Sequence, residues 1–107
     1  MTNGRGANGE RVAFFNGAIV PEREVKLPLH DRGFKYGDAV FDMTRSFGHR
    51  IFKLEEHIRC LYNSLRYLQI DPGLAASQMI AKTEDVFADN QPLFGPDDDY
   101  WIGQRVT

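Results

Sequence analysis

Short segments in which hydrophobic and polar residues alternate predict several β-strands. Val12–Phe15 and Ala18–Val20 flank the dipeptide Asn16-Gly17. An Asn-Gly pair between two such segments favours a two-residue hairpin, because both turn positions need a positive φ angle. The alternation over Val25–Leu29 then predicts a short edge strand.

The longest alternating segment, Ala39–Phe47, predicts a central strand. Its two faces would carry Phe41, Met43, Arg45 and Phe47 on one side and Val40, Asp42, Thr44 and Ser46 on the other. The segment from Gly33 to Gly37 predicts a loop or a single turn before it. A last strand is expected over Tyr100–Val106, with one face formed by Tyr100, Ile102, Gln104 and Val106.

Helical spacing of the hydrophobic residues predicts two helices. The first covers about Leu54–Leu68, and its buried stripe would consist of Leu54, Ile58, Leu61, Leu65 and Leu68. The second runs roughly over Leu74–Ala88, with one face formed by Ala76, Met79, Ile80, Thr83 and Phe87. Strands and helices segregated in this way predict an α+β fold, an antiparallel sheet with two helices packed on one face.

Length and composition limit the classes of protein. A chain of 107 residues holds one domain, and its formal net charge of −2 gives no basic excess for nucleic acid or for a membrane surface. Residues 1–11 are polar and rich in Gly and Asn, which predicts a flexible tail before a domain over residues 12–107. The single cysteine, Cys60, cannot form an internal disulfide. Together with the lack of a secretory signal, it predicts a cytoplasmic protein.

Residue types alone do not reveal an enzyme. No Gly-rich phosphate loop follows a predicted strand, and no metal site is expected because three different predicted elements hold His30, His49 and His57. A lysine that reacts with a carbonyl group needs a desolvated pocket. Solvated side chains are instead expected for Lys26, Lys35, Lys53 and Lys82.

Two motifs carry a family resemblance. The first is the loop-strand unit Asp31–Asp42, DRGFKYGDAVFD, and the second is Glu56-His57, followed by Leu61 and Ser64. Together they resemble the N-terminal domain of the class IV aminotransferases, which are pyridoxal-phosphate enzymes of the branched-chain and D-amino-acid type. The resemblance implies the small domain of a fold-type IV enzyme, transfer of an amino group between an amino acid and a 2-oxo acid, and a homodimer.

The resemblance also implies substrate-binding residues. Phe41 matches an aromatic residue of the family's substrate side-chain pocket, and Tyr36 matches one that lies near the substrate, often across the dimer interface. Arg45 stands where some branched-chain members have arginine. Each residue has a structural alternative: core packing on a sheet face for Phe41, anchoring of the loop for Tyr36, and a solvated charge for Arg45.

At one position the chain departs from the family pattern. The resemblance places a phosphate-binding arginine three residues after the helix histidine, where this chain has Cys60. Arg59 precedes it, but adjacent helical residues project about 100° apart, so Arg59 does not simply inherit the role. The alternative for Cys60 is a small residue facing the core. His57 is expected to be structural, and Asp42 replaces the glutamate that is usual in the family.

The family's cofactor lysine lies in its second domain, and we expect neither in these 107 residues. The strand that reaches Thr107 is expected to be cut rather than finished. This segment alone would then be inactive and would not hold pyridoxal phosphate covalently. Two alternatives remain open: a non-catalytic stand-alone domain used for self-association, or the same half of a class IV lyase.

Overall fold

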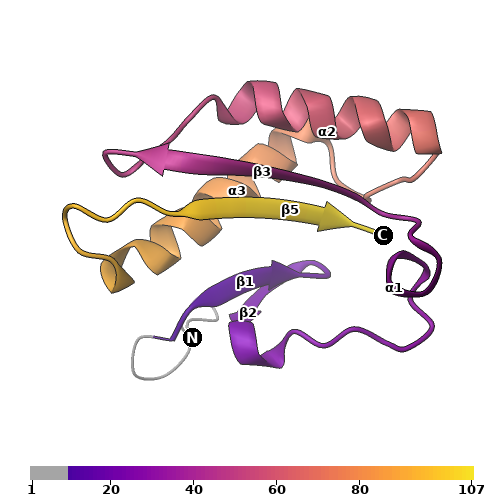
Figure 1. Cartoon of the computed structure of the whole chain (residues 1–107), viewed down its shortest axis with the longest axis horizontal. Coiled ribbons are helices and arrows are strands. Elements are labelled where there is room, and N and C mark those ends of the chain that lie inside the picture. The colour runs from indigo at the N-terminus through magenta and orange to yellow at the C-terminus, as the bar shows by residue number, and fades with distance from the viewer. Residues whose placement is uncertain (1–9) are drawn as a thin grey trace.

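The computed structural model describes residues 10–107 (Figure 1). Its elements are, in chain order, β1 (Val12–Phe15), β2 (Ala18–Pro21), α1 (Arg32–Tyr36), β3 (Val40–Phe47), β4 (Arg50–Ile51), α2 (Leu54–Leu68), α3 (Ala76–Asn90) and β5 (Trp101–Val106). Single 3-10 turns, η2 (Glu22–Glu24) and η3 (Gln91–Leu93), follow β2 and α3. The α+β composition predicted from the sequence is confirmed.

The strands form two antiparallel sheets. β3 is the central strand of the larger sheet, whose order is β4-β3-β5, and it pairs with β5 from Val40↔Val106 to Arg45↔Trp101. The predicted Asn-Gly hairpin is confirmed: β1 and β2 form the smaller sheet, closed by Asn16 at φ 48° and Gly17 at φ 97°. Figure 1 shows this hairpin beside β5, with β1 as the nearer strand.

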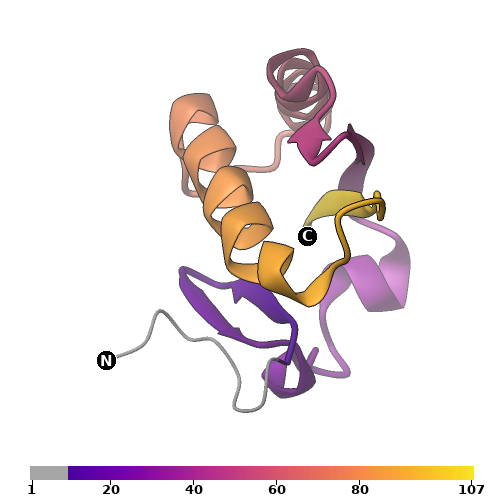
Figure 2. The same ribbon diagram turned by 90° about the vertical axis from the view of Figure 1, so that its left-hand side faces the viewer.

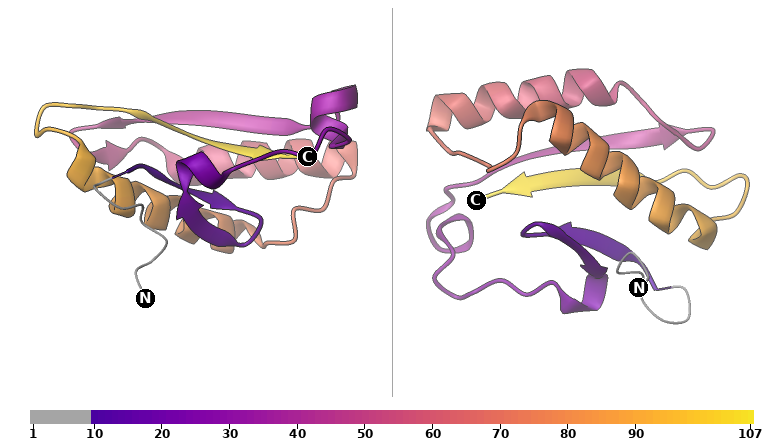
Figure 3. Two further views of the ribbon diagram at one scale, coloured as in Figure 1. Left: turned by 90° about the horizontal axis from the view of Figure 1, so that it is seen from below. Right: turned by 180° about the vertical axis from the view of Figure 1, so that it is seen from behind.

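Both long helices cover the same face of the larger sheet. The view from below in Figure 3 shows α2 and α3 on one side of β3 and β5. The end view in Figure 2 shows the two helices next to one another on that side. This is the predicted packing of two helices on one face, and it leaves the other face of β3 and β5 without a helix.

The alternation along β3 decides which side chains enter the core. Val40, Thr44 and Ser46 are buried against the helices, while Phe41, Met43 and Phe47 are exposed. The hydrophobic core is completed by Leu54, Ile58, Leu61 and Leu65 of α2 and by Met79 of α3. Full burial of such aliphatic side chains stabilises a fold by roughly 1.5–3 kcal/mol each. The more hydrophobic face of β3 is therefore not the one that this chain buries.

Helix α2 has the predicted bounds, and four of its five predicted stripe residues are buried. Leu68 is the exception, since it is 49% exposed. Its place is taken by Ile70, which follows the left-handed residue Gln69, packs against the core, and donates its N–H to the Leu65 carbonyl at 2.9 Å. This reversal is the usual hydrophobic closure of a helix C-terminus. Neither α2 nor another helix within residues 10–107 is long and apolar enough to cross a bilayer.

The second long helix begins two residues later than predicted. Gly73 has φ 77° and donates its N–H to the Asp71 side chain at 2.8 Å, which holds the chain in a turn. Helix α3 starts after Ala75, whose N–H is bound by the Gln78 carboxamide oxygen at 2.8 Å. The turn therefore keeps Leu74 out of the helix, although Leu74 still packs against the core.

The edge strand predicted over Val25–Leu29 is wrong. The structure has no strand there, and Leu27 and Leu29 are 57% and 69% exposed. Pro28 lacks an N–H for a sheet ladder, and its carbonyl accepts the Asp31 N–H at 3.1 Å in a turn. The alternation in this segment therefore marks exposed hydrophobic side chains rather than a strand.

Candidate functional site

The side of β3 and β5 turned away from the helices is the candidate site, which we call the outer face. It carries Phe41, Met43, Arg45, Phe47, Trp101 and Arg105. Strand geometry dictates this set, because alternate side chains of paired strands share one face. Phe41 and Trp101 are 64% and 66% exposed. Core packing, the structural alternative for Phe41, is therefore not its role in this chain.

Phe41 lies opposite Arg105 across the two strands. The Arg105 guanidinium carbon is 5.3 Å from the centre of the Phe41 ring, a distance at which a cation is attracted to an aromatic face. Within the part of the chain that the structure describes, no carboxylate pairs with Arg105. Sequence reasoning did not select Arg105, because cross-strand register is not visible in a strand read by itself.

Arg45 lies four residues further along the outer face and is held by three contacts. Its guanidinium is 4.1 Å from the Phe47 ring centre and 3.7 Å from the Asp99 carboxylate, and its Nε donates to the Ser46 carbonyl at 3.1 Å. The alternative of a merely solvated charge therefore does not describe Arg45, which has a fixed position at the β4 end of β3.

Asp99 owes its ionised state to its neighbours. Its Oδ1 accepts a hydrogen bond from the Ser46 hydroxyl at 2.8 Å. This bond first, then the His49 N–H and the charge of Arg45, lower the pKa of Asp99 below its ordinary value, against a smaller opposing effect of burial. A carboxylate that stays ionised keeps Arg45 paired.

Tyr36 ends the short helix α1 and is 63% exposed. The Asp31 carboxylate caps the helix by accepting the Phe34 N–H at 3.1 Å, and Gly37, at φ 75°, ends it. The Tyr36 ring lies 5.6 Å from the Arg32 guanidinium and 5.5 Å from the Lys35 ammonium group. These ring contacts come from its own helix, so the structure does not join Tyr36 to Phe41 directly.

Helix α1 is nevertheless attached to the Phe41 end of the sheet. The Thr107 hydroxyl donates to the Asp31 carboxylate at 2.8 Å, which is the main reason why the pKa of Asp31 is lowered. A side chain at Gly33 would collide with Thr107 and crowd Ala39. The close approach at Gly33 therefore places the Tyr36 helix next to the strand ends that carry Phe41 and Arg105.

The helix motif lies on the other side of β3. His57 Nδ1 is 2.9 Å from Asp42 Oδ2, which supports a structural role for His57. Cys60 and Arg59 are both exposed. The alternative that Cys60 faces the core is therefore wrong: the core-facing positions of this turn are Ile58 and Leu61.

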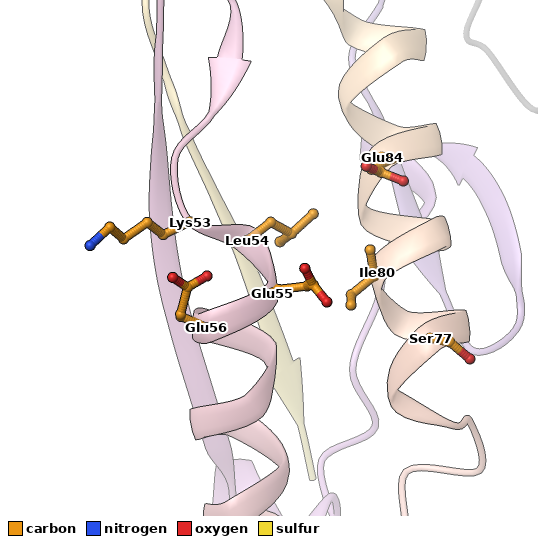
Figure 4. Close-up of a pocket in the computed structure, with 7 residues that line it drawn as sticks. All are labelled: Lys53, Leu54, Glu55, Glu56, Ser77, Ile80 and Glu84. Atoms are coloured by element: carbon orange, nitrogen blue, oxygen red, sulfur yellow. The ribbon is translucent and has the colours of Figure 1, made fainter.

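A second, shallow groove lies between the start of α2 and the middle of α3 (Figure 4). Its volume is about 420 Å³, and its lining consists of Lys53, Leu54, Glu55, Glu56, Ser77, Ile80 and Glu84. Figure 4 shows Glu55 pointing toward α3 and Glu56 pointing away from it. Among residues 10–107 no three His, Cys, Asp or Glu side chains come close enough together to hold a metal ion. The groove contains none of the residues predicted from the sequence.

Comparisons with known proteins connect the outer face to one class of enzyme. A protein named as a branched-chain-amino-acid aminotransferase in Methanocaldococcus jannaschii is 40% identical over 67 residues, which are 63% of this chain and 23% of that protein. D-alanine aminotransferase of Bacillus licheniformis is 30% identical over 77 residues, 72% of this chain and 27% of that protein.

The structural comparison gives the same result. A bacterial branched-chain amino acid aminotransferase (T.th.), complexed with N-(5'-phosphopyridoxyl)-L-glutamate, matches with a TM-score of 0.78 at 25% identity and covers 90% of this chain. The chain is homologous to the N-terminal part of the class IV aminotransferases. It spans 23% to 32% of the length of these three relatives. No protein-family model matches the chain.

Proposed function

We propose that this chain is the N-terminal part of a class IV aminotransferase that transfers an amino group between an amino acid and a 2-oxo acid with pyridoxal phosphate. The observation that carries the proposal is the agreement of sequence and fold: one set of aminotransferases matches the chain both in residues and in three dimensions. Because these relatives carry aminotransferase names, they do not favour a non-catalytic association domain or a lyase.

In this proposal the outer face forms one wall of the substrate site. Phe41 is an exposed aromatic surface for an apolar substrate side chain, and Tyr36 approaches from α1 at the same end of the sheet. Arg45 acts at the far end of the face, where Asp99 neutralises it. An apolar surface of this kind, with a few fixed polar groups, is typical of small-molecule sites and suits a branched-chain amino acid.

The cofactor proposal rests on the relatives, two of which are titled as complexes with a phosphopyridoxyl amino acid and with pyridoxamine 5'-phosphate. A pyridoxal group supplies an electron sink for amino-group transfer. The residues of this chain fit it incompletely, since the family's arginine position holds Cys60, and a thiol cannot form the bidentate, charge-assisted contact of a guanidinium with phosphate. Cys60 is exposed, so the position is open but lacks the charge.

The domain organisation, the assembly and the compartment are part of the same proposal. The tail is kept at residues 1–11, of which residues 1–9 lie outside the described part of the chain. Residues 12–107 form the N-terminal domain, and the cofactor lysine belongs to a second domain supplied from elsewhere in the enzyme. We also propose a homodimer, because exposed hydrophobic residues gather near α1, among them Leu27, Leu29, Phe34 and Tyr36. The exposed free thiol of Cys60 suits the reducing cytoplasm.

The test is a chimera in which this 107-residue chain replaces the matching N-terminal part of the M. jannaschii relative. We expect the chimera to bind pyridoxal phosphate and to transfer the amino group of a branched-chain amino acid to 2-oxoglutarate. The matched control is the same chimera with Phe41→Ala, which should fold equally well and lose activity. A folded chimera with no activity toward branched-chain or D-amino acids would overturn the proposal.

A further inference from the structure

An apolar groove separates β5 from the β1-β2 hairpin. Its volume is about 770 Å³. Its hydrophobic lining includes Val12, Phe14, Leu27, Leu74, Val86 and Ile102. Figure 1 shows β1 and β5 on either side of this space, with their arrows pointing the same way. Two strand edges therefore face each other across the groove without pairing.

The edge of β5 that faces the groove has free backbone groups. The Ser46 N–H donates to the Tyr100 carbonyl at 2.9 Å, which fixes the alternation of the β3-β5 ladder. Antiparallel strands bond through alternate residues. The backbone groups of Trp101, Gly103 and Arg105 must therefore point away from β3, and none of them has a hydrogen-bond partner within residues 10–107.

The facing edge of β1 has the same character, with one informative exception. The hairpin register directs the backbone groups of Val12 and Phe14 outward. Those of Val12 are bound by Asn90, whose Oδ1 accepts the Val12 N–H at 2.8 Å and whose Nδ2 donates to the Val12 carbonyl at 2.9 Å. One side-chain amide thus replaces a neighbouring strand at Val12, while Phe14 has no such substitute.

The dimensions of the groove fit one strand. Six residues, the length of β5, extend about 20 Å. Over that length the groove has a cross-section of about 40 Å², whereas one strand occupies roughly 4.8 Å by 10 Å in a packed sheet. A second copy of this chain cannot bring its own β5 into this space, because its β3 would collide with β1. The occupant must be a single extended segment.

Neither strand edge shows the features by which sheet edges avoid pairing. Such edges usually carry proline, a bulge or inward-pointing charges. β5 reads Trp101–Val106 without proline. The groove also contains Gln104, which is 9% exposed and whose Oε1 is buried without a hydrogen-bond donor. A buried acceptor left unpaired costs about 1–3 kcal/mol, so an occupant that donates to it would gain binding energy.

We propose that this groove binds one β-strand, antiparallel to both β5 and β1, which joins the two sheets into one. We assign the strand to the part of the aminotransferase polypeptide outside these 107 residues, so this inference rests on the proposed function. Main-chain hydrogen bonds supply the affinity in such strand addition, and the apolar lining selects hydrophobic side chains at alternate positions.

Amide hydrogen exchange, followed by NMR, tests the proposal in the 107-residue chain and in the chimera. In the chain alone, the amides of Phe14, Trp101, Gly103 and Arg105 should exchange rapidly. In the chimera these four should exchange at least about ten-fold more slowly, because each gains a hydrogen bond. Ile102, already bonded to β3, serves as the internal control and should change little.

A second variant keeps the test decisive if the chimera does not fold. In it the 107-residue chain is extended by an Asn-Gly turn and a ~6-residue strand of alternating Val and Thr. Its control carries proline at the centre of that strand. Protection of the four amides, lost in the proline version, supports the groove; no protection overturns it. A folded chimera that leaves the amides unprotected overturns the assignment to the aminotransferase polypeptide, even if the added strand binds.

The outcome is independent of catalysis. Protected amides in an inactive chimera support the strand while contradicting the proposed function. An active chimera with unprotected amides does the reverse.

Discussion

His57 on α2 and Asp42 on β3 are joined by a hydrogen bond of 2.9 Å between Nδ1 and Oδ2. A carboxylate can only accept, so His57 donates. The other Asp42 oxygen accepts the Met43 N–H at 2.9 Å. The pair fixes the first turns of α2 over the strand that carries Phe41, and thereby sets the position of Cys60, one turn further along the helix.

Removing this contact should destabilise the domain. Asp42→Ala loses both hydrogen bonds, and we expect the free energy of unfolding to fall by about 1–2 kcal/mol, because the pair is partly buried. Asp42→Asn keeps an acceptor for His57 and should lose less than half of that. Urea denaturation of the three proteins measures the difference. Equal losses for Ala and Asn would mean that the hydrogen bond to His57 does not stabilise the domain.

Two neighbouring residues of β3 should respond in opposite ways to alanine. Val40 is 7% exposed and packs in the core, so Val40→Ala should lower the free energy of unfolding by about 2 kcal/mol. Phe41 is 64% exposed, so Phe41→Ala should change stability by less than about 0.5 kcal/mol. In the chimera, Phe41→Ala should instead raise KM for branched-chain substrates. A large loss of stability from Phe41→Ala would contradict the exposed position of this side chain.

Arginine at position 60 should strengthen cofactor binding. In the chimera, Cys60→Arg places a guanidinium at the position where the family resemblance puts its phosphate-binding arginine. Charge-assisted hydrogen bonds contribute roughly 1.5–3 kcal/mol, which corresponds to about a ten-fold to hundred-fold lower Kd for pyridoxal phosphate. Because Cys60 is exposed, the substitution should leave the melting temperature unchanged.

The control for this experiment is Tyr67→Arg, which adds the same charge to the same helix about 10 Å further along. Tyr67 is 86% exposed, so this variant should also fold normally. Titration of pyridoxal phosphate into each apo-chimera, followed by absorbance, gives the Kd values. Equal gains for both variants would indicate a general charge effect rather than a contact at position 60.

The Ser46–Asp99 hydrogen bond should affect stability at acid pH. It is the main cause of the lowered pKa of Asp99. A carboxyl group whose pKa is lower in the folded state stabilises the fold above its unfolded pKa, and this contribution disappears as the pH falls through the folded pKa. Ser46→Ala should therefore raise the pKa of Asp99 toward about 3.9 and weaken the dependence of stability on pH below about 5. Carboxyl ¹³C NMR titration follows Asp99 directly, and an unchanged titration would contradict the role of Ser46.

Local sequence determined the elements of this domain. The Asn16-Gly17 turn, the alternation along β3 and the stripe of α2 each arise from rules that act within a few residues, and the structure confirms all three. The two family motifs likewise indicated the aminotransferase relationship, because they are continuous in the chain.

Tertiary structure decided what local patterns leave open. Alternation separates the two faces of β3 but does not say which is buried; α2 and α3 cover the face with Val40 and leave Phe41 exposed. The same alternation over Val25–Leu29 produced no strand, because a strand needs a partner edge as well as a pattern. The pairing of Arg105 with Phe41, and of Asn90 with Val12, joins residues 64 and 78 positions apart. Such contacts depend on how sheets and helices pack, which no short segment of sequence contains.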